Sequence, residues 1–100
     1  MMLKIHQQDD VCVNQLKVLA DFTRFSVVRL LMEGPKHVNE LNECIKVDQS
    51  LLSHHLKLLR DAGIVTANRD GKAVLYQLAG TVHIKEEIIH LGCCNLSFEE

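Results

Sequence analysis

Two of the four cysteines in this sequence, Cys93 and Cys94, are adjacent near its C-terminal end. Thiolates are soft ligands that select soft or thiophilic ions, and they also undergo reversible oxidation. The two side chains cannot bridge each other without distorting the peptide unit between them. In a reducing compartment, an even number of cysteines indicates metal binding, redox chemistry or packing rather than a disulfide framework. All three uses of the pair are open at this point.

The amino-acid composition limits the class of protein to which this chain can belong. The 100 residues are 47% hydrophobic and 24% charged, which is typical of one globular domain. A domain of this size has a modest core, so pairing with a second copy would bury additional surface. No apolar run reaches the length of a membrane span, and the opening MMLKIHQQDD turns polar before a signal peptide develops. We therefore expect a cytoplasmic protein.

Charge is segregated along the chain, whose net charge is −2. A mildly acidic total disfavours nucleic-acid binding, but such binding depends on a local patch. Lysines and arginines outnumber acids between Lys46 and Lys72, whereas the residues from Glu86 onwards include acids and no lysine or arginine. A locally basic segment is therefore followed by an acidic end.

The first part of the chain has the apolar spacing of three helices. Asp21 and Thr23 separate the first two, and Gly34-Pro35 ends the second. The third is about two turns long, and we interpret its Cys44 as a packed side chain. The apolar positions of the three are Val13, Leu16, Leu19, Phe25, Val28, Leu31, Met32, Val38, Leu41, Cys44 and Ile45.

A fourth helix is predicted between Asp48, a suitable N-cap, and Gly63, a suitable stop. Its inward stripe consists of Leu51, Leu52, His55, Leu56 and Leu59, which makes His55 a core histidine. Its polar face consists of Gln49, Ser50, Ser53, His54 and Lys57. Two short helices separated by a tight break have the layout of a helix-turn-helix.

The apolar period then changes from helix to strand. Val74, Tyr76 and Leu78 alternate, and Asp70-Gly71 is typical of a type I′ hairpin turn, which predicts a two-stranded wing. A final helix is expected from Thr81 to about Cys94. Its apolar side would consist of Val82, Ile84, Ile88, Ile89 and Leu91.

Three segments carry a family resemblance. LKVLADFTRFSVVRLLMEG, SLLSHHLKLLRDAGIV and RDGKAVLYQL resemble the arsenic-repressor (ArsR/SmtB) family of metal-sensing winged-helix repressors, from about Leu16 to Leu78. The resemblance implies a mainly α fold with a two-stranded wing and one winged helix-turn-helix domain over residues 1–100. It also implies a homodimer formed through the first and last helices, and a repressor that stays on its operator until an inducer binds.

The resemblance also implies which residues contact double-stranded operator DNA. It assigns DNA reading to Gln49, Ser50, Ser53, His54 and Lys57, and phosphate contacts to Arg69 and Lys72 of the wing. The chemistry agrees, because short polar side chains suit base edges and phosphates while lysine and arginine supply the salt-dependent attraction. Without the surrounding motif, the same face would be interpreted as a solvated helix surface.

Two sensor sites known in the family are missing. The thiol site on the first helix of the helix-turn-helix corresponds to residues 36–41, which contain no cysteine. The zinc site on the last helix corresponds to Gly80 and Val82 at two of its ligand positions. His83 and His90 could form a different metal site across a dimer, or they are surface or interface histidines.

The adjacent cysteines resemble a variant of the family that binds arsenite at the end of its last helix. As(III) takes three sulfur ligands in a pyramid, and adjacent cysteines supply two of them with little loss of loop entropy. The variant takes its third sulfur a few residues further on, where this chain has none. Cys12 is the substitute, because the first and last helices pack together in this dimer type. The expected inducer is As(III) or Sb(III), bound by Cys93, Cys94 and Cys12, although Cys12 could instead be a packed or exposed thiol.

Other functions compete with this hypothesis. A thiol-redox or reactive-sulfur responsive repressor would bridge Cys12 to Cys93 or Cys94 on oxidation. A Zn-, Cd- or Cu-sensing repressor would use the same cysteines with a histidine. A small enzyme is disfavoured, because the sequence shows no Cys-x-x-Cys, phosphate-binding loop or nucleophile with an obvious base. A winged helix that only contacts proteins would leave Gln49, Ser53 and Lys57 without a purpose.

Overall fold

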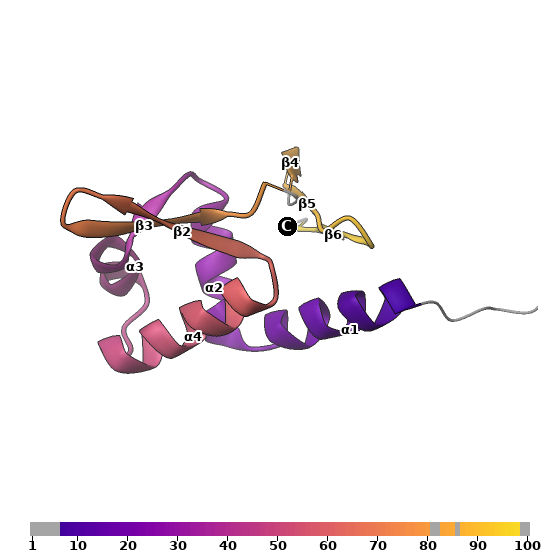
Figure 1. Ribbon diagram of the computed structural model, residues 1–100, viewed down its shortest axis with the longest axis horizontal. Coiled ribbons are helices and arrows are strands. Elements are labelled where there is room, and N and C mark those ends of the chain that lie inside the picture. The colour runs from indigo at the N-terminus through magenta and orange to yellow at the C-terminus, as the bar shows by residue number, and fades with distance from the viewer. Residues whose placement is uncertain (1–6, 81–82, 86, 99–100) are drawn as a thin grey trace, which may run out of the picture.

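Helices occupy the first part of the chain and strands the last, as the computed structural model shows for residues 7–80, 83–85 and 87–98 (Figure 1). The helices are α1 (Gln7–Leu19), α2 (Phe22–Leu31), α3 (Val38–Cys44) and α4 (Gln49–Asp61). The strands are β1 (Lys36–His37), β2 (Val65–Asp70), β3 (Ala73–Leu78), β4 (His83–Lys85), β5 (Ile88–His90) and β6 (Asn95–Ser97).

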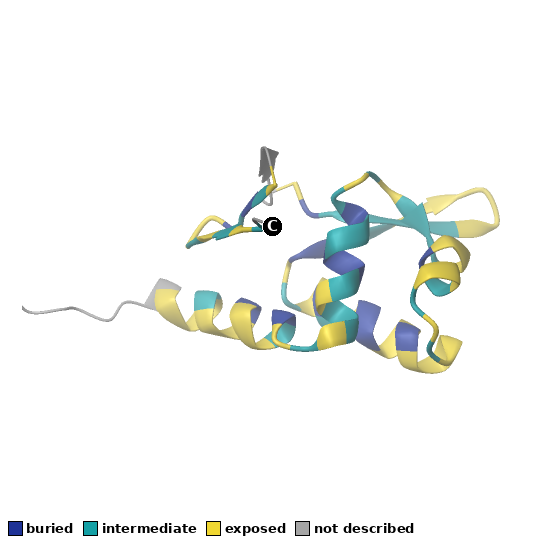
Figure 2. Ribbon diagram, turned by 180° about the vertical axis from the view of Figure 1, so that it is seen from behind, coloured by how far each residue is buried: buried dark blue, intermediate teal, exposed yellow. Residues whose placement is uncertain are grey.

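The core lies between α2, α3, α4 and the base of the wing. Figure 2 shows the buried residues gathered there, whereas much of α1 is exposed. The predicted stripe of α4 is buried except for Leu51, which is 45% exposed. The buried apolar set is Leu19, Val27, Val28, Leu31, Leu41, Leu52, Leu56, Leu59, Ile64, Val65, Ala79, Ile89 and Leu91.

The wing forms as an antiparallel sheet with the order β1-β3-β2. The hairpin stands where the sequence predicts it, but Asp70 pairs with Ala73, so the loop consists of Gly71 and Lys72. Gly71 has a φ of +66°, whereas Lys72 does not have a positive φ. A type I′ turn needs positive φ at both central residues, so the predicted turn type is wrong although its position is close.

The predicted final helix is wrong. Residues 83–85, 88–90 and 95–97 form an antiparallel sheet with the order β4-β5-β6, while Thr81 and Val82 lie outside the described residues. Ile89 and Leu91 are both buried, two residues apart, which is the period of a strand and not of a helix. β-branched isoleucines favour strands. Gly92 has a φ of +95°, which a helix does not accommodate.

The C-terminal sheet is fastened to α2 by aromatic and ionic contacts. Phe25 and Phe98 meet edge to face with ring centroids 5.3 Å apart. The Arg29 guanidinium lies 4.4 Å from the centre of the Phe98 ring and pairs with Glu87 at 3.3 Å. These contacts place the loop between β5 and β6 beside α1 (Figure 1).

Cys44 also differs from its prediction. It ends α3 on the exposed side and is a free thiol, so it does not pack in the core. Within the described residues, none of the helices has the length and apolar character needed to cross a membrane.

Candidate thiol site and nucleic-acid interface

Three of the four cysteines meet between α1 and the β5–β6 loop. The Sγ atoms of Cys12, Cys93 and Cys94 all lie within 4.8 Å of one another. Cys12 and Cys93 are joined by a disulfide, and the free Sγ of Cys94 lies 3.7 Å from that of Cys12 and 3.8 Å from that of Cys93. The structure therefore brings together the three cysteines singled out in the sequence, although a loop between two strands, and not a helix, carries two of them.

A tight turn presents the adjacent cysteines to α1. The backbone N–H of Leu91 donates to the carbonyl of Cys94 at 2.9 Å, and the positive φ of Gly92 allows the reversal. Leu91 is buried and Cys94 packs against the core, while Cys93 is exposed. A small pocket opens beside Cys93 and gives access to the cluster. Its lining residues are Val11, Gln15, Leu91, Gly92 and Cys93.

Gln15 is a member of this site that the sequence reasoning missed. Its side-chain Oε1 lies 3.8 Å from the Sγ of Cys93, and its Nε2 donates to the carbonyl of Ala62 at 3.3 Å. The side chain is only 8% exposed. One signal was available, because Gln15 follows Cys12 by three positions on α1 and therefore shares its face.

The histidines near the C-terminus lie on neighbouring strands. His83 is opposite His90 in the β4–β5 register. The ring Nδ1 of His90 lies 2.8 Å from Oδ1 of Asn95, which is a local bond across the β5–β6 hairpin. The side chain of His83 lies outside the described residues, so a site shared by the two histidines stays a prediction.

The face predicted to read DNA is exposed along α4. Its five side chains project to solvent from the first turns of the helix, where a recognition helix meets base edges. Asp48 occupies the N-cap position without a side-chain capping bond. The Nζ of Lys57 donates to Oδ2 of Asp61 at 2.9 Å, and this bond holds the pKa of Asp61 below its ordinary 3.8. The five exposed residues are Gln49, Ser50, Ser53, His54 and Lys57.

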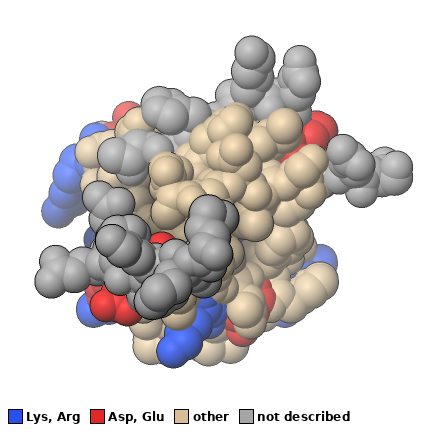
Figure 3. All heavy atoms as spheres, turned by 90° about the vertical axis from the view of Figure 1, so that its right-hand side faces the viewer, with Lys and Arg blue, Asp and Glu red and all other residues tan. Residues whose placement is uncertain are grey.

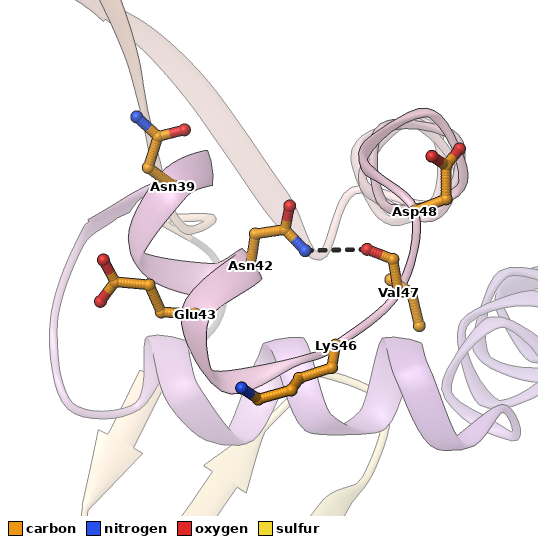
Figure 4. Close-up of a pocket in the computed structure, with 6 residues that line it drawn as sticks. All are labelled: Asn39, Asn42, Glu43, Lys46, Val47 and Asp48. Carbon is orange, nitrogen blue, oxygen red and sulfur yellow. Dashed lines mark hydrogen bonds between the residues drawn. The ribbon is translucent and has the colours of Figure 1, made fainter.

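The turn that leads into α4 is fixed by one side chain. The Asn42 amide donates to the carbonyls of Ile45 at 3.0 Å and Val47 at 2.9 Å. Figure 4 shows Asn42 reaching across this turn at the centre of an open pocket, with Lys46 and Asp48 on its rim. One amide group on α3 thus holds two carbonyls of the segment that connects α3 to α4.

The wing carries its two predicted cations in exposed positions. Arg69 lies on β2 and Lys72 in the hairpin loop. His37 joins the wing to the start of α3, because its Nδ1 lies 3.1 Å from the Val74 carbonyl and its Nε2 lies 3.1 Å from Oδ2 of Asp70. His37 thus holds the wing and the start of α3 in one fixed arrangement.

A polar network ties α4 to the other helices. The Arg24 Nη1 donates to Nδ1 of His55 at 2.9 Å, and its Nε donates to the carbonyl of Val18 on α1. His55 is 9% exposed, which confirms its assignment to the core. Asp21 caps α2 by accepting from the backbone N–H of Arg24 at 3.0 Å. This bond is the main reason why the pKa of Asp21 lies below its ordinary value.

Comparison with known proteins bears on the identity of the chain. Residues 21–67 match the family described as "Bacterial regulatory protein, arsR family". The HTH-type transcriptional repressor SmtB of Mycobacterium tuberculosis is 43% identical over 70% of this chain, which spans about half (52%) of that relative's length. The arsenical resistance operon repressor of Staphylococcus aureus is 40% identical over 82% of this chain and 78% of its own length.

Solved structures agree with these relatives. HlyU from Vibrio cholerae N16961 superimposes with a TM-score of 0.73 at 30% identity, covering 77% of this chain and 84% of HlyU. A homodimeric winged helix-turn-helix domain from Mycobacterium bovis has a TM-score of 0.67 at 25% identity, covering 80% of this chain and 77% of that domain. The matching relatives are transcriptional regulators and not enzymes. With the winged helix-turn-helix in place, these matches show that the chain belongs to the arsR family of bacterial regulatory proteins.

Proposed function

We propose that this protein is a transcriptional repressor that leaves its operator when As(III) or Sb(III) binds Cys12, Cys93 and Cys94. The observation that carries the proposal is the meeting of three Sγ atoms within 4.8 Å, which joins α1 to the β5–β6 loop. The arsenical resistance repressor of Staphylococcus aureus is among the relatives that support it. The exposed polar face of α4, with Arg69 and Lys72 on the wing, supplies the DNA-binding surface.

The donor set suits a thiophilic trivalent ion. Three thiols can replace the three hydroxyls of arsenous acid, so that As(OH)₃ and three RSH give As(SR)₃ and three H₂O. The Cys12–Cys93 disulfide must first accept two electrons and two protons from a cellular dithiol, because a bridged sulfur is not a thiolate ligand. The pocket beside exposed Cys93 offers the entry path.

A homodimer is part of this proposal. The apolar residues Val13 and Leu16 of α1 are 49% and 40% exposed. Viewed from the end at which α1 begins, uncharged side chains make up much of the surface that is not drawn in grey, and lysine and arginine lie mostly towards its edges (Figure 3). A related Mycobacterium bovis domain is homodimeric. Pairing through α1 would set the separation of the two recognition helices, which must match successive half-sites.

A ligand that joins α1 to the C-terminal sheet would act on this interface. Coupling of about 1–3 kcal/mol between inducer and DNA is typical of allosteric proteins and is sufficient for derepression. The route runs through α1 because this helix carries Cys12 together with the exposed apolar side chains of Val13 and Leu16.

One observation favours a second candidate, a repressor that responds to thiol oxidation. Cys12 and Cys93 are bridged in the structure, and Cys94 is positioned to exchange with either sulfur. With a peroxide as oxidant, two thiols and H₂O₂ give the disulfide and two H₂O. In that case the disulfide form, and not a metalloid complex, would release DNA.

The two candidates are separated by titrating preformed complexes with an operator duplex selected from a random DNA library. Arsenite is added to protein kept reduced with a phosphine, since a dithiol would compete for arsenic, and hydrogen peroxide is added to a second sample. We expect arsenite to release wild-type protein and the Cys44→Ser control, and to leave the Cys93→Ser/Cys94→Ser variant bound. Release of that double variant by arsenite would show the site to be wrong, and release of wild type by peroxide alone would favour the redox candidate.

A further inference from the structure

Gln15 touches both functional parts of the molecule. Among the described residues, Gln15 and His55 are the buried polar side chains, and Gln15 has one end of its amide at the thiol site. The other end donates to Ala62, which is the C-cap of the recognition helix α4. A single buried side chain therefore spans the distance from Cys93 to the end of α4.

The two ends of an amide are chemically different. Nε2 can only donate hydrogen bonds and Oε1 can only accept them. Because Nε2 is directed to the Ala62 carbonyl, Oε1 is the atom that faces the sulfur of Cys93. A reduced Cys93 thiol can donate a hydrogen bond to Oε1. In the reduced protein, the thiol, both ends of the Gln15 amide and the Ala62 carbonyl therefore all have a hydrogen-bond partner.

Metalloid binding changes what the sulfur offers. When Cys93 ligates As(III), its proton leaves in the water that is released, and the sulfur becomes an acceptor with partial negative charge. Hydrogen-bond donors near a ligand atom orient that ligand and tune its affinity for the metal. The stable partner for a ligated sulfur is therefore Nε2 and not Oε1. Rotation of the amide would satisfy the sulfur and turn Oε1 towards the Ala62 carbonyl, where two acceptors repel.

We propose that Gln15 is the positioning residue that transmits ligation of the thiol cluster to the recognition helix, by giving up its bond to Ala62. This inference rests on the proposed metalloid response. A disulfide sulfur carries no such charge, and in the bridged structure Gln15 keeps its bond to Ala62. Ligation and oxidation of the same cysteines thus have different consequences for α4.

The first test measures coupling rather than affinity alone. Operator Kd is determined for the reduced protein with and without saturating arsenite, and arsenite binding is measured separately by calorimetry. We expect arsenite to weaken wild-type binding by about 5- to 150-fold, the usual allosteric range. For Gln15→Met, similar in length but without the amide, arsenite should still bind and the weakening should fall below about threefold. The matched control is Asn14→Ala, an exposed change on the same helix that should behave as wild type.

The outcomes distinguish this inference from the proposed function. If the wild-type protein binds arsenite without losing DNA affinity, the proposed function itself is wrong. A Gln15→Met protein that binds arsenite and loses DNA affinity by the wild-type factor would overturn the role of Gln15 alone.

A second measurement uses the wild-type protein and therefore does not depend on whether a variant folds. In ¹⁵N-labelled wild type, the Gln15 side-chain NH₂ resonances should shift when arsenite binds and keep their position when Cys12 and Cys93 are oxidised from the reduced state. Equal shifts in the two cases, or none with arsenite, would contradict the proposed rotation.

Discussion

Lys57, on helix α4, forms an ion pair within the protein in the absence of DNA. Its Nζ donates to Asp61 one turn further along α4, and the two side chains are both more than half exposed. Exposed pairs of this kind contribute little to stability. If Lys57 contacts DNA as proposed, a phosphate oxygen can therefore take the place of the Asp61 carboxylate at small cost.

Replacing either partner of this pair should change operator binding in opposite directions. Lys57→Ala removes a cation, so we expect weaker operator binding. The negative slope of log K against log salt should become shallower by about 1. Asp61→Asn removes the competing anion and should strengthen binding while leaving Lys57 in place. Operator titrations between about 50 and 200 mM salt provide both values. A wild-type slope for Lys57→Ala would exclude Lys57 from the phosphate contacts.

The connection between α1 and α2 is the point at which three helices are held together. Asp21 caps α2, and Arg24 in the first turn of α2 reaches both the Val18 carbonyl of α1 and the ring of His55 in α4. The orientation of α1, which carries Cys12, is thereby linked to that of the recognition helix. Asp21 acts on this network from the exposed side, since its carboxylate lies 3.9 Å from Nδ1 of His55.

Loss of the Asp21 cap should destabilise the domain in a pH-dependent way. Removing an N-cap side chain costs about 1 kcal/mol, so Asp21→Ala should lower the free energy of unfolding by that amount at pH 7. The backbone N–H of Arg24 holds the pKa of Asp21 below 3.8 in the folded state. The unfolded chain then binds more protons in acid, so the contribution is complete above pH 3.8 and is lost as the pH falls through the lower folded value.

Urea unfolding tests this pH dependence. The free energy of unfolding is measured for wild type, Asp21→Ala and Asp21→Asn at pH 7 and at progressively lower pH. Asparagine also caps helices well but does not titrate. We expect the deficit of the alanine variant to narrow in acid. An alanine deficit of equal size at every pH would mean that the Asp21 charge takes no part in capping.

The sequence allowed the helices and the wing to be predicted because each has a clear local period. The C-terminal segment failed because apolar residues at 84, 88, 89 and 91 fit a helical spacing, while the burial of Ile89 and Leu91 follows a strand. The meeting of Cys12 with Cys93 and Cys94 was anticipated from the family's packing of its first and last helices, although strands take the place of the last helix here. Gln15 was missed because its partners lie 47 and 78 positions away, and the one local signal, its place on the same face of α1 as Cys12, does not identify them.

The whole molecule is elongated, with extents of 53 × 27 × 24 Å, and α1 forms one end of it (Figure 1). One face of α1 carries Cys12 and Gln15 towards the C-terminal sheet and α4. Val13 and Leu16, which lie beside Cys12 on the same helix, are exposed to solvent. If a second copy covers these two side chains, a change at the thiol cluster shifts the helix on which the dimer is built, and the wings and recognition helices of both copies move together.

This arrangement predicts that a charge on the outer face of α1 abolishes operator binding without unfolding the domain. Leu16 is 40% exposed in the single chain, so Leu16→Asp should change its unfolding only slightly. In a dimer the same carboxylate would be buried without a partner, which is strongly unfavourable. Sedimentation equilibrium should therefore show a monomer, and affinity for a two-half-site operator should fall at least about tenfold, because one recognition helix must then hold the DNA alone. Asn14→Asp adds the same charge at an exposed position elsewhere on α1 and should remain dimeric. A dimeric Leu16→Asp protein with unchanged operator affinity would place the partner on another surface and separate the thiol site from the interface.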